Sequence, residues 1–128
     1  MTYITYIHPH CMDGSVPGYL VPIQWINSIP VAVSDNNINS FLRAYFYSQS
    51  TSAKVTIFFT TAGPQSIQFK TVVSSQVVTG IGAASGQWQL GKVELHLTNL
   101  SANQINTIRI TTNQAICYVV GVLVETDP

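Results

Sequence analysis

The stretch SAKVTIFFTT, residues 52–61, alternates apolar and polar side chains over almost its whole length. Its apolar residues fall on one face of an extended chain and its polar residues on the other: Ala53, Val55, Ile57 and Phe59 against Lys54, Thr56 and Thr60. Successive side chains of a strand point to opposite faces of the sheet. The stretch therefore predicts a half-buried strand in an antiparallel sheet.

The same period of two recurs along the chain. GKVELHLTN (91–99) and NTIRITT (106–112) alternate in the same way, and AICYVVGVLVE (115–125) is apolar on both faces, which predicts a central strand covered on both sides. Turn residues separate the strands, among them the glycine-rich TGIGAASG (79–86). No segment carries apolar residues at helical spacing with caps. We expect an all-β fold, an antiparallel β-sandwich of eight to ten strands, built from segments at 2–7, 19–25, 30–34, 40–48, 52–61, 65–73, 75–79, 87–98, 104–112 and 115–125.

Composition limits the classes of function. The 128 residues suit one domain, 1–128, and 46% of them are apolar while only 8% are charged. Five basic residues balance five acidic ones, so the chain lacks the positive charge that nucleic acid or an anionic membrane attracts. No apolar run reaches the ~18 residues of a membrane helix, and MTYITYIHPH (1–10) is not a signal peptide. The polar, weakly charged composition favours an extracellular or surface-displayed protein.

Residues 38–125 carry a series of short motifs. NSFLRAYFYSQSTSAKVTIFFTTAG (39–63) is followed by GQWQLGKVELHLTNL (86–100), by INTIRITT (105–112) and by the apolar last strand. This order resembles the galactose-binding-like jelly rolls, particularly their carbohydrate-binding modules, in which x-L-x-R-Y-A, G-x-W before V-x-L, and N-x-I-R-I follow one another. The resemblance implies a jelly-roll sandwich that binds a glycan. The closing N-I-D of that family is replaced here by Ala115-Ile116-Cys117, which removes a frequent sugar-contacting asparagine.

Trp88 is the first candidate ligand residue. A tryptophan ring offers a flat apolar face on which a sugar ring packs, and Gln87 beside it offers an amide to sugar hydroxyls. This hypothesis puts an aromatic platform on a mobile glycine-rich loop, TGIGAASGQW (79–88). The alternative is a core tryptophan that closes one end of the sandwich.

The strand around residue 43 offers a second candidate surface. One of its faces carries three aromatic rings and an arginine: Phe41, Arg43, Tyr45 and Tyr47. They would form a groove for a ring-shaped ligand, or else an ordinary half-buried face covered by a neighbouring loop. In the second case Arg43 either extends its charged end to solvent or pairs with Glu94. Asn113, in the turn before the last strand, has an amide suited to sugar hydroxyls and is also a common turn residue.

The segment IHPHCMDGS, residues 7–15, gathers residue types that bind zinc: His8, His10, Cys11 and Asp13. A structural zinc site usually takes two pairs of ligands from separate turns, and the remaining histidine, His96, stands alone in a predicted strand. We therefore expect a polar loop without a metal, and no cofactor.

Cys11 and Cys117 are the chain's two cysteines. In the jelly rolls that the chain resembles, the N-terminal segment often lies near the last strand, so a disulfide between the two would be within reach. The alternative is two free thiols, with Cys117 buried as a small apolar residue.

Catalysis is poorly supported, because the chain has few carboxylates and a glycosidase needs two that face one cleft. We therefore expect a non-catalytic carbohydrate-binding domain whose partner is a glycan or polysaccharide. The rival hypothesis is a structural or receptor-binding protein of a virion, a phage tail or a secreted toxin or crystal assembly. That protein would form a homotrimer or a larger homo-oligomer.

Overall fold

The computed structural model describes residues 2–15, 23–26, 29–34, 40–113 and 117–126. Within them, eleven strands form one curled antiparallel sheet, and the helical structure is a single short 3-10 turn, η1 (Pro9–Cys11). The strands are β1 (Tyr3–Ile7), β2 (Asp13–Ser15), β3 (Ile23–Ile26), β4 (Ile29–Ser34), β5 (Phe41–Ser48), β6 (Ala53–Thr60), β7 (Gln65–Val73), β8 (Gln76–Ala84), β9 (Gly91–Leu97), β10 (Gln104–Thr112) and β11 (Cys117–Thr126). No helix in these ranges has the length and apolar character to cross a membrane.

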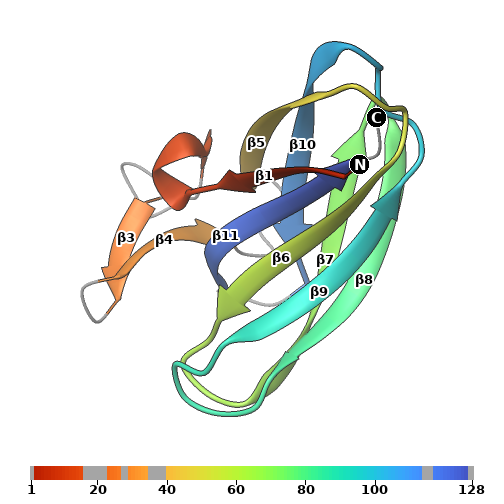
Figure 1. The fold of residues 1–128 in the computed structure, drawn as a ribbon. Coiled ribbons are helices and arrows are strands. Elements are labelled where there is room, and N and C mark those ends of the chain that lie inside the picture. Colours follow the sequence, from red (N-terminus) through yellow and green to blue (C-terminus); the bar gives the residue numbers. More distant parts are fainter. Residues whose placement is uncertain (1, 16–22, 27–28, 35–39, 114–116, 127–128) are drawn as a thin grey trace.

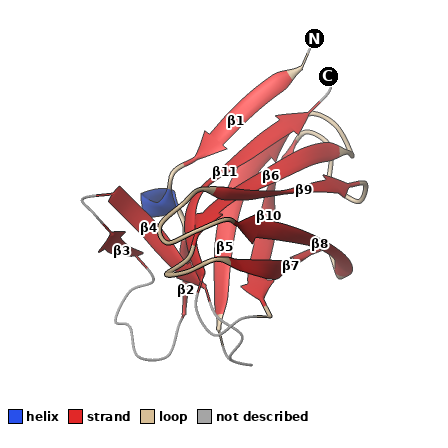
Figure 2. Cartoon of the chain, turned by 90° about the horizontal axis from the view of Figure 1, so that it is seen from below, coloured by secondary structure: helices blue, strands red, loops and turns tan. Residues whose placement is uncertain are grey.

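The sheet folds over on itself into two layers. Its strand order is β2-β5-β10-β7-β8-β9-β6-β11-β4-β3, and β1 pairs with β11 beside this path. Between β8 and β9 the ladder is a single residue pair, Ala83 with Lys92, and there the sheet turns over. The β5 layer (β2, β5, β10, β7 and β8) then faces the β6 layer (β9, β6, β11, β4, β3 and β1), as Figures 1 and 2 show.

The core lies between the layers and is built from alternate residues of each strand. In β6 the residues predicted to face inward, Ala53, Val55, Ile57 and Phe59, are all buried. Phe59 meets Phe69 of β7 from the opposite layer, with their ring centroids 5.0 Å apart. The predicted all-β antiparallel sandwich is therefore confirmed, with eleven strands among the described residues where eight to ten were predicted.

The last strand occupies a central position, as predicted. β11 pairs with β6 along one edge and with β4 and β1 along the other. Its outward residues Tyr118, Val120 and Leu123 are only half-buried, so the prediction of full cover on both faces was wrong. The pairing of β11 with β6 slips by one residue between Val119 and Gly121. Along the other edge, β4 pairs with the first residues of β11 and β1 with its second half.

The prediction that the glycine-rich stretch 79–86 forms a turn was wrong. Most of this stretch forms the second half of β8. A side chain on Gly80 would lie 2.5 Å from Leu95 Cδ2, and one on Gly82 would lie 2.5 Å from the Lys92 carbonyl oxygen. The glycines therefore permit close approach of β8 to β9 rather than a reversal of the chain. Strand β9 begins at Gly91 and not at residue 87 as predicted. The loop that carries Trp88 therefore comprises residues 85–90.

Candidate functional site

The outer face of the β5 layer collects aromatic and basic side chains from three neighbouring strands. Because residues alternate in and out, the outward positions of β5, β10 and β7 form one surface. We call it the tyrosine face, and it comprises Phe41, Arg43, Tyr45 and Tyr47 of β5, Ile105, Thr107, Arg109 and Thr111 of β10, and Gln68, Lys70 and Val72 of β7.

Two tyrosines are the most exposed aromatic rings of β5. Tyr45 and Tyr47 expose 40% and 52% of their surface, and the residue across from Tyr47 on β10, Ile105, exposes 70%. Two positions along a strand are about 6.8 Å apart, so the rings present one continuous apolar strip. Thr107 lies opposite Tyr45 and adds a hydroxyl beside this strip.

Asp13 joins the tyrosine face through the short strand β2, which lies antiparallel to β5 with Asp13 opposite Arg43. Arg43 donates two hydrogen bonds to the Asp13 carboxylate, at 2.8 Å from Nε and 3.1 Å from Nη2. The Tyr45 hydroxyl also donates to this carboxylate, at 2.9 Å. The pairing of Arg43 with Glu94, one of the alternatives left open by the sequence, does not form, because Glu94 lies on the other layer, with its carboxylate 3.6 Å from the Lys54 ammonium.

The three groups shift one another's protonation in a consistent direction. The hydrogen bond from Arg43, and then that from Tyr45, lowers the pKa of Asp13 below its ordinary 3.8. The hydrogen bond to Asp13 raises the pKa of Arg43 and that of Tyr45. The site is therefore held as carboxylate, guanidinium and neutral phenol at neutral pH.

Phe41 lies between two guanidinium groups. The Arg109 guanidinium sits 4.1 Å from the centre of the Phe41 ring, and that of Arg43 sits 5.1 Å from it. Such cation–π contacts hold both arginines against the sheet. Arg43 and Arg109 are also cross-strand partners, so two positive charges lie side by side on this face.

Asn113 lies at the same surface, where its backbone and side chain bridge to β7. Its N–H donates to the Gln68 carbonyl at 3.1 Å, and its side-chain oxygen accepts from the Gln68 N–H at 2.8 Å. This supports the turn role considered for Asn113. Of the six residues predicted as ligand contacts, four thus share one surface, namely Arg43, Tyr45, Tyr47 and Asn113.

Trp88 and Gln87 lie elsewhere, in the loop that joins β8 to β9. The backbone N–H of Trp88 donates to the Thr61 carbonyl at 3.0 Å, and the Trp88 ring packs against Tyr118 of β11 with centroids 5.6 Å apart. The ring is half-buried at a hollow of about 170 Å³ whose lining is almost entirely apolar: Ile26, Ile29, Val31, Thr60, Leu90 and Val120. Gln87 is exposed.

The histidine segment forms a compact turn. The His8 ring nitrogen Nδ1 accepts a hydrogen bond from the backbone N–H of His10 at 3.1 Å. The His10 ring meets the Trp25 ring edge-on, with centroids 5.6 Å apart. Asp13 faces Arg43 instead. Nowhere in the described ranges do three histidine, cysteine or acidic side chains gather around a point where a metal could bind.

Cys11 and Cys117 are both free thiols, so the disulfide considered from the sequence does not form. Cys11 is exposed and Cys117 is buried, which raises the pKa of the Cys117 thiol. The alternative, in which Cys117 packs as a small apolar residue, describes the structure.

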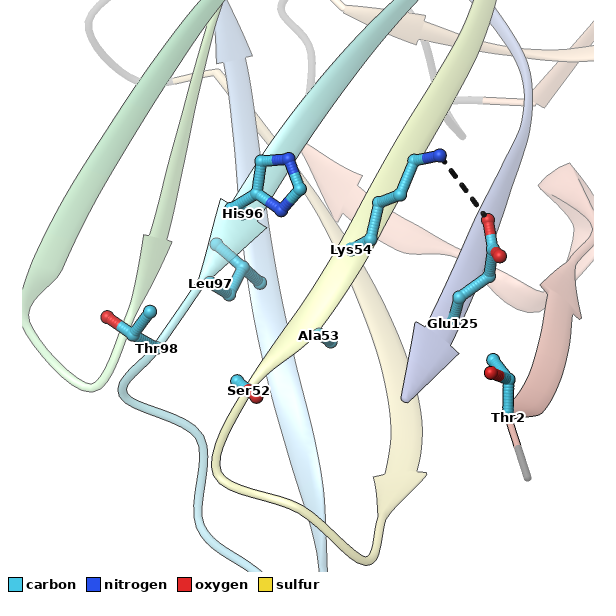
Figure 3. A pocket seen from close by; sticks show the side chains of 8 residues that line it. All are labelled: Thr2, Ser52, Ala53, Lys54, His96, Leu97, Thr98 and Glu125. Carbon is cyan, nitrogen blue, oxygen red and sulfur yellow. Dashed lines mark ion pairs between the residues drawn. The ribbon is translucent and has the colours of Figure 1, made fainter. Parts of the chain in front are cut away.

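A polar hollow of about 340 Å³ lies on the β6 layer, beside Lys54 (Figure 3). Figure 3 shows Lys54 between His96 and Glu125, and its ammonium reaches the Glu125 carboxylate at 4.0 Å. Lys54 also lies 3.6 Å from Glu94, which in turn lies 3.7 Å from Lys92. These charges neutralise one another, and among the described residues no tyrosine, tryptophan or phenylalanine ring lines the hollow, so it is a weaker candidate for binding sugar rings than the tyrosine face.

Comparison with known proteins places the fold. The CBM36-1 domain of a multidomain xylanase from the hindgut metagenome of Trinervitermes trinervoides has a similar structure, with a TM-score of 0.72 over 98% of each chain and 12% sequence identity. No protein-family model and no curated protein matches the chain. The structural likeness confirms the predicted jelly-roll sandwich fold.

Sequence reasoning missed three contributors to the tyrosine face. Arg109 alternates with Ile108 and Ile110, which indicates an outward position but not that it is a neighbour of Tyr45, and Lys70 was not considered. Asp13 was considered as a metal ligand, because β2 is too short to show a period of two. The order β2-β5-β10-β7 alone brings these residues together.

Proposed function

We propose that the chain is a non-catalytic carbohydrate-binding domain, extracellular or surface-displayed, whose glycan lies across the tyrosine face. The observation that carries this proposal is the pair of exposed rings, Tyr45 and Tyr47, set beside a fixed polar cluster on one outer face of the sandwich. Sugar rings pack their C–H faces on aromatic rings while their hydroxyls need hydrogen-bond partners. The tyrosine face offers both.

Each residue has a definite part in this proposal. Tyr47, whose ring is the more exposed, stacks on one sugar, and Tyr45 supports the neighbouring one. Arg43 is held by Asp13 in a fixed orientation, so its remaining N–H groups meet sugar hydroxyls at little entropic cost. The side-chain oxygen of Asn113 accepts a hydrogen bond from the Gln68 N–H, and in this proposal the side-chain NH₂ group donates to a sugar hydroxyl.

The fold supports the same function. The structural neighbour is a domain of the carbohydrate-binding-module type, in a multidomain xylanase. A likeness at 12% identity does not transfer that enzyme's substrate, so the nature of the glycan is a separate question.

Trp88 with Gln87 is a second, separate candidate platform. Its hollow supplies little for sugar hydroxyls, because the lining is apolar and the Thr60 hydroxyl already donates to the Gln89 carbonyl at 3.0 Å. For this reason we favour the tyrosine face.

The rival function, an oligomeric structural or receptor-binding protein, has its own observation. Three apolar side chains are largely exposed near one end of the sandwich, Trp25 at 63%, Leu90 at 62% and Ile29 at 52%. Exposed apolar residues of this kind favour contact with another protein surface. A subunit interface there would leave the tyrosine face free, so the two functions are separable.

A glycan array combined with a light-scattering mass tests the proposal. Carbohydrate binding by a monomer is the expected result. A stable oligomer that binds no glycan would contradict it and favour the rival function.

A further inference from the structure

The few charges of the chain are divided unequally between its two outer faces. Among the described residues, Lys54 and Lys92 of the β6 layer pair with Glu94 and Glu125. The other three basic residues, Arg43, Lys70 and Arg109, lie on the tyrosine face, where Asp13 pairs with Arg43 alone. That face is therefore positively charged in a protein that is neutral as a whole.

Lys70 and Arg109 line one hollow of about 280 Å³, together with Ser40, Val72 and Thr111. In the strand register Lys70 lies opposite Thr111 and Val72 lies opposite Arg109. The two cations therefore occupy diagonal positions on adjacent strands, about 7–8 Å apart at their backbones, and long side chains from such positions can reach one group. Neither forms an ion pair within the described part of the chain.

Ser40 supplies a second, independent observation. Only 3% of its surface is exposed, and its hydroxyl has no hydrogen-bond partner in the described ranges although it lines the same hollow. A buried hydroxyl without a partner among the described residues is unfavourable, and this one lies beside the hollow. The neighbouring Thr111 hydroxyl adds another donor.

Arg109 is positioned in advance for such a group. Its guanidinium is held 4.1 Å from the centre of the Phe41 ring, which fixes the side chain without neutralising its charge. A guanidinium matches the two oxygens of a carboxylate or sulfate group, and Lys70 adds a point charge. The hollow thus combines two cations with the Thr111 hydroxyl, and the unpaired Ser40 hydroxyl lies beside it.

We propose that this hollow binds the anionic group, a carboxylate or a sulfate, of an acidic polysaccharide whose sugar rings lie on Tyr45 and Tyr47. The inference rests on the proposed function and specifies the ligand class. The hollow shares the tyrosine face with both rings, because Arg109 lies two residues from Thr107, the partner of Tyr45. An acidic chain along β5 and β10 would meet the tyrosines and the cations together.

Titration with three polymers tests this: polygalacturonate, the same polymer with its carboxyl groups reduced to alcohols, and a sulfated galactan. We expect one of the charged polymers to bind about tenfold more tightly than the reduced polymer, and the difference to disappear at high salt. Comparison of the two charged polymers identifies the carboxylate or the sulfate as the ligand group.

Variants locate the effect. Arg109→Gln and Lys70→Gln should each remove most of the preference for the charged polymer, whereas Lys92→Gln, on the β6 layer, should leave it unchanged. Thermal melts show whether each variant is folded. If Arg109→Gln disturbs the fold by removing the contact with Phe41, Lys70→Gln still tests the inference, because Lys70 is exposed.

The possible failures are distinct. Equal affinity for the charged and reduced polymers would overturn this inference and leave the proposed carbohydrate binding in place. Binding of inorganic sulfate without binding of any polymer would overturn the inference and argue against the tyrosine face as a glycan site.

Discussion

Asp13 holds two side chains of β5 through one carboxylate. It accepts hydrogen bonds from Arg43 and from Tyr45 across the β2–β5 pair. Gly14 allows this arrangement, because a side chain there would collide with the Phe41 carbonyl oxygen. A residue that the sequence suggested as a metal ligand therefore organises the polar part of the tyrosine face.

Replacing Asp13 by Asn should make stability depend less on pH. The pKa of Asp13 in the folded protein lies below 3.8, so its charge stabilises the fold at neutral pH and this contribution is lost as the pH falls through the folded pKa. We expect Asp13→Asn to melt slightly below the wild type at neutral pH, since half the side chain is exposed. The gap should close in acid. A gap of constant size across a pH series of melts would contradict this origin.

Trp88 combines a large ring with a backbone φ of 55°, a conformation that costs a non-glycine residue about 1 kcal/mol or more. Trp88→Ala and Trp88→Gly both remove the ring from Tyr118, but only glycine relieves the backbone. Because the ring is half-buried, we expect Trp88→Ala to lower the free energy of unfolding by about 2 kcal/mol. The loss for Trp88→Gly should be smaller than that for Trp88→Ala by about 1 kcal/mol. Denaturant curves measure both. Alanine more stable than glycine would be inconsistent with the described loop.

The two cysteines should differ sharply in reactivity. Cys11 is exposed, while burial of Cys117 raises the pKa of its thiol and blocks access to it. We expect a thiol reagent to label Cys11 in the native protein and Cys117 only after unfolding. Mass spectrometry of the labelled peptides shows the difference. A chain in which neither cysteine is labelled after unfolding without reductant would instead contain a disulfide.

Among the elements, β8 is the one whose sequence was most misleading. The prediction ended the strand at residue 79, because the three glycines of residues 79–86 suggested a loop, whereas the strand continues to Ala84. Period-two segments such as β7 and β10 were predicted with their observed bounds, since alternation is a local signal. The approach of β8 to β9 depends on distant residues and has no local signature.

Gly82→Ala should therefore destabilise the protein through steric overlap. The added methyl group would lie 2.5 Å from the Lys92 carbonyl oxygen and 2.8 Å from Cε1 of Phe59. We expect a loss of about 1–3 kcal/mol in the free energy of unfolding. Gly63→Ala, with nothing within 4 Å of the new methyl group, is the matched control and should change stability by less than about 0.5 kcal/mol. Equal effects of the two changes would show that β8 does not pack as described.

At the scale of the whole molecule, the two outer faces have different chemistry. The β6 layer carries a row of mutually neutralised charges, and the β5 layer carries exposed rings beside basic groups. The sequence predicted the residues of β5 that share a face, because alternation within a strand is local. It did not predict that Arg109 and Lys70 adjoin them, because that depends on which strands pair across more than twenty residues of intervening chain.

The account depends most on the position of the glycan. Titration of the wild type, Tyr47→Ala and Tyr3→Ala with one bound polysaccharide tests it directly, because both tyrosines are about equally exposed but Tyr3 lies on β1 of the other layer. Tyr47→Ala removes a stacking ring, so it should weaken binding roughly tenfold or more while its melting temperature stays unchanged. Tyr3→Ala should leave binding unchanged. Wild-type affinity in Tyr47→Ala would contradict the claim that the tyrosine face binds the glycan.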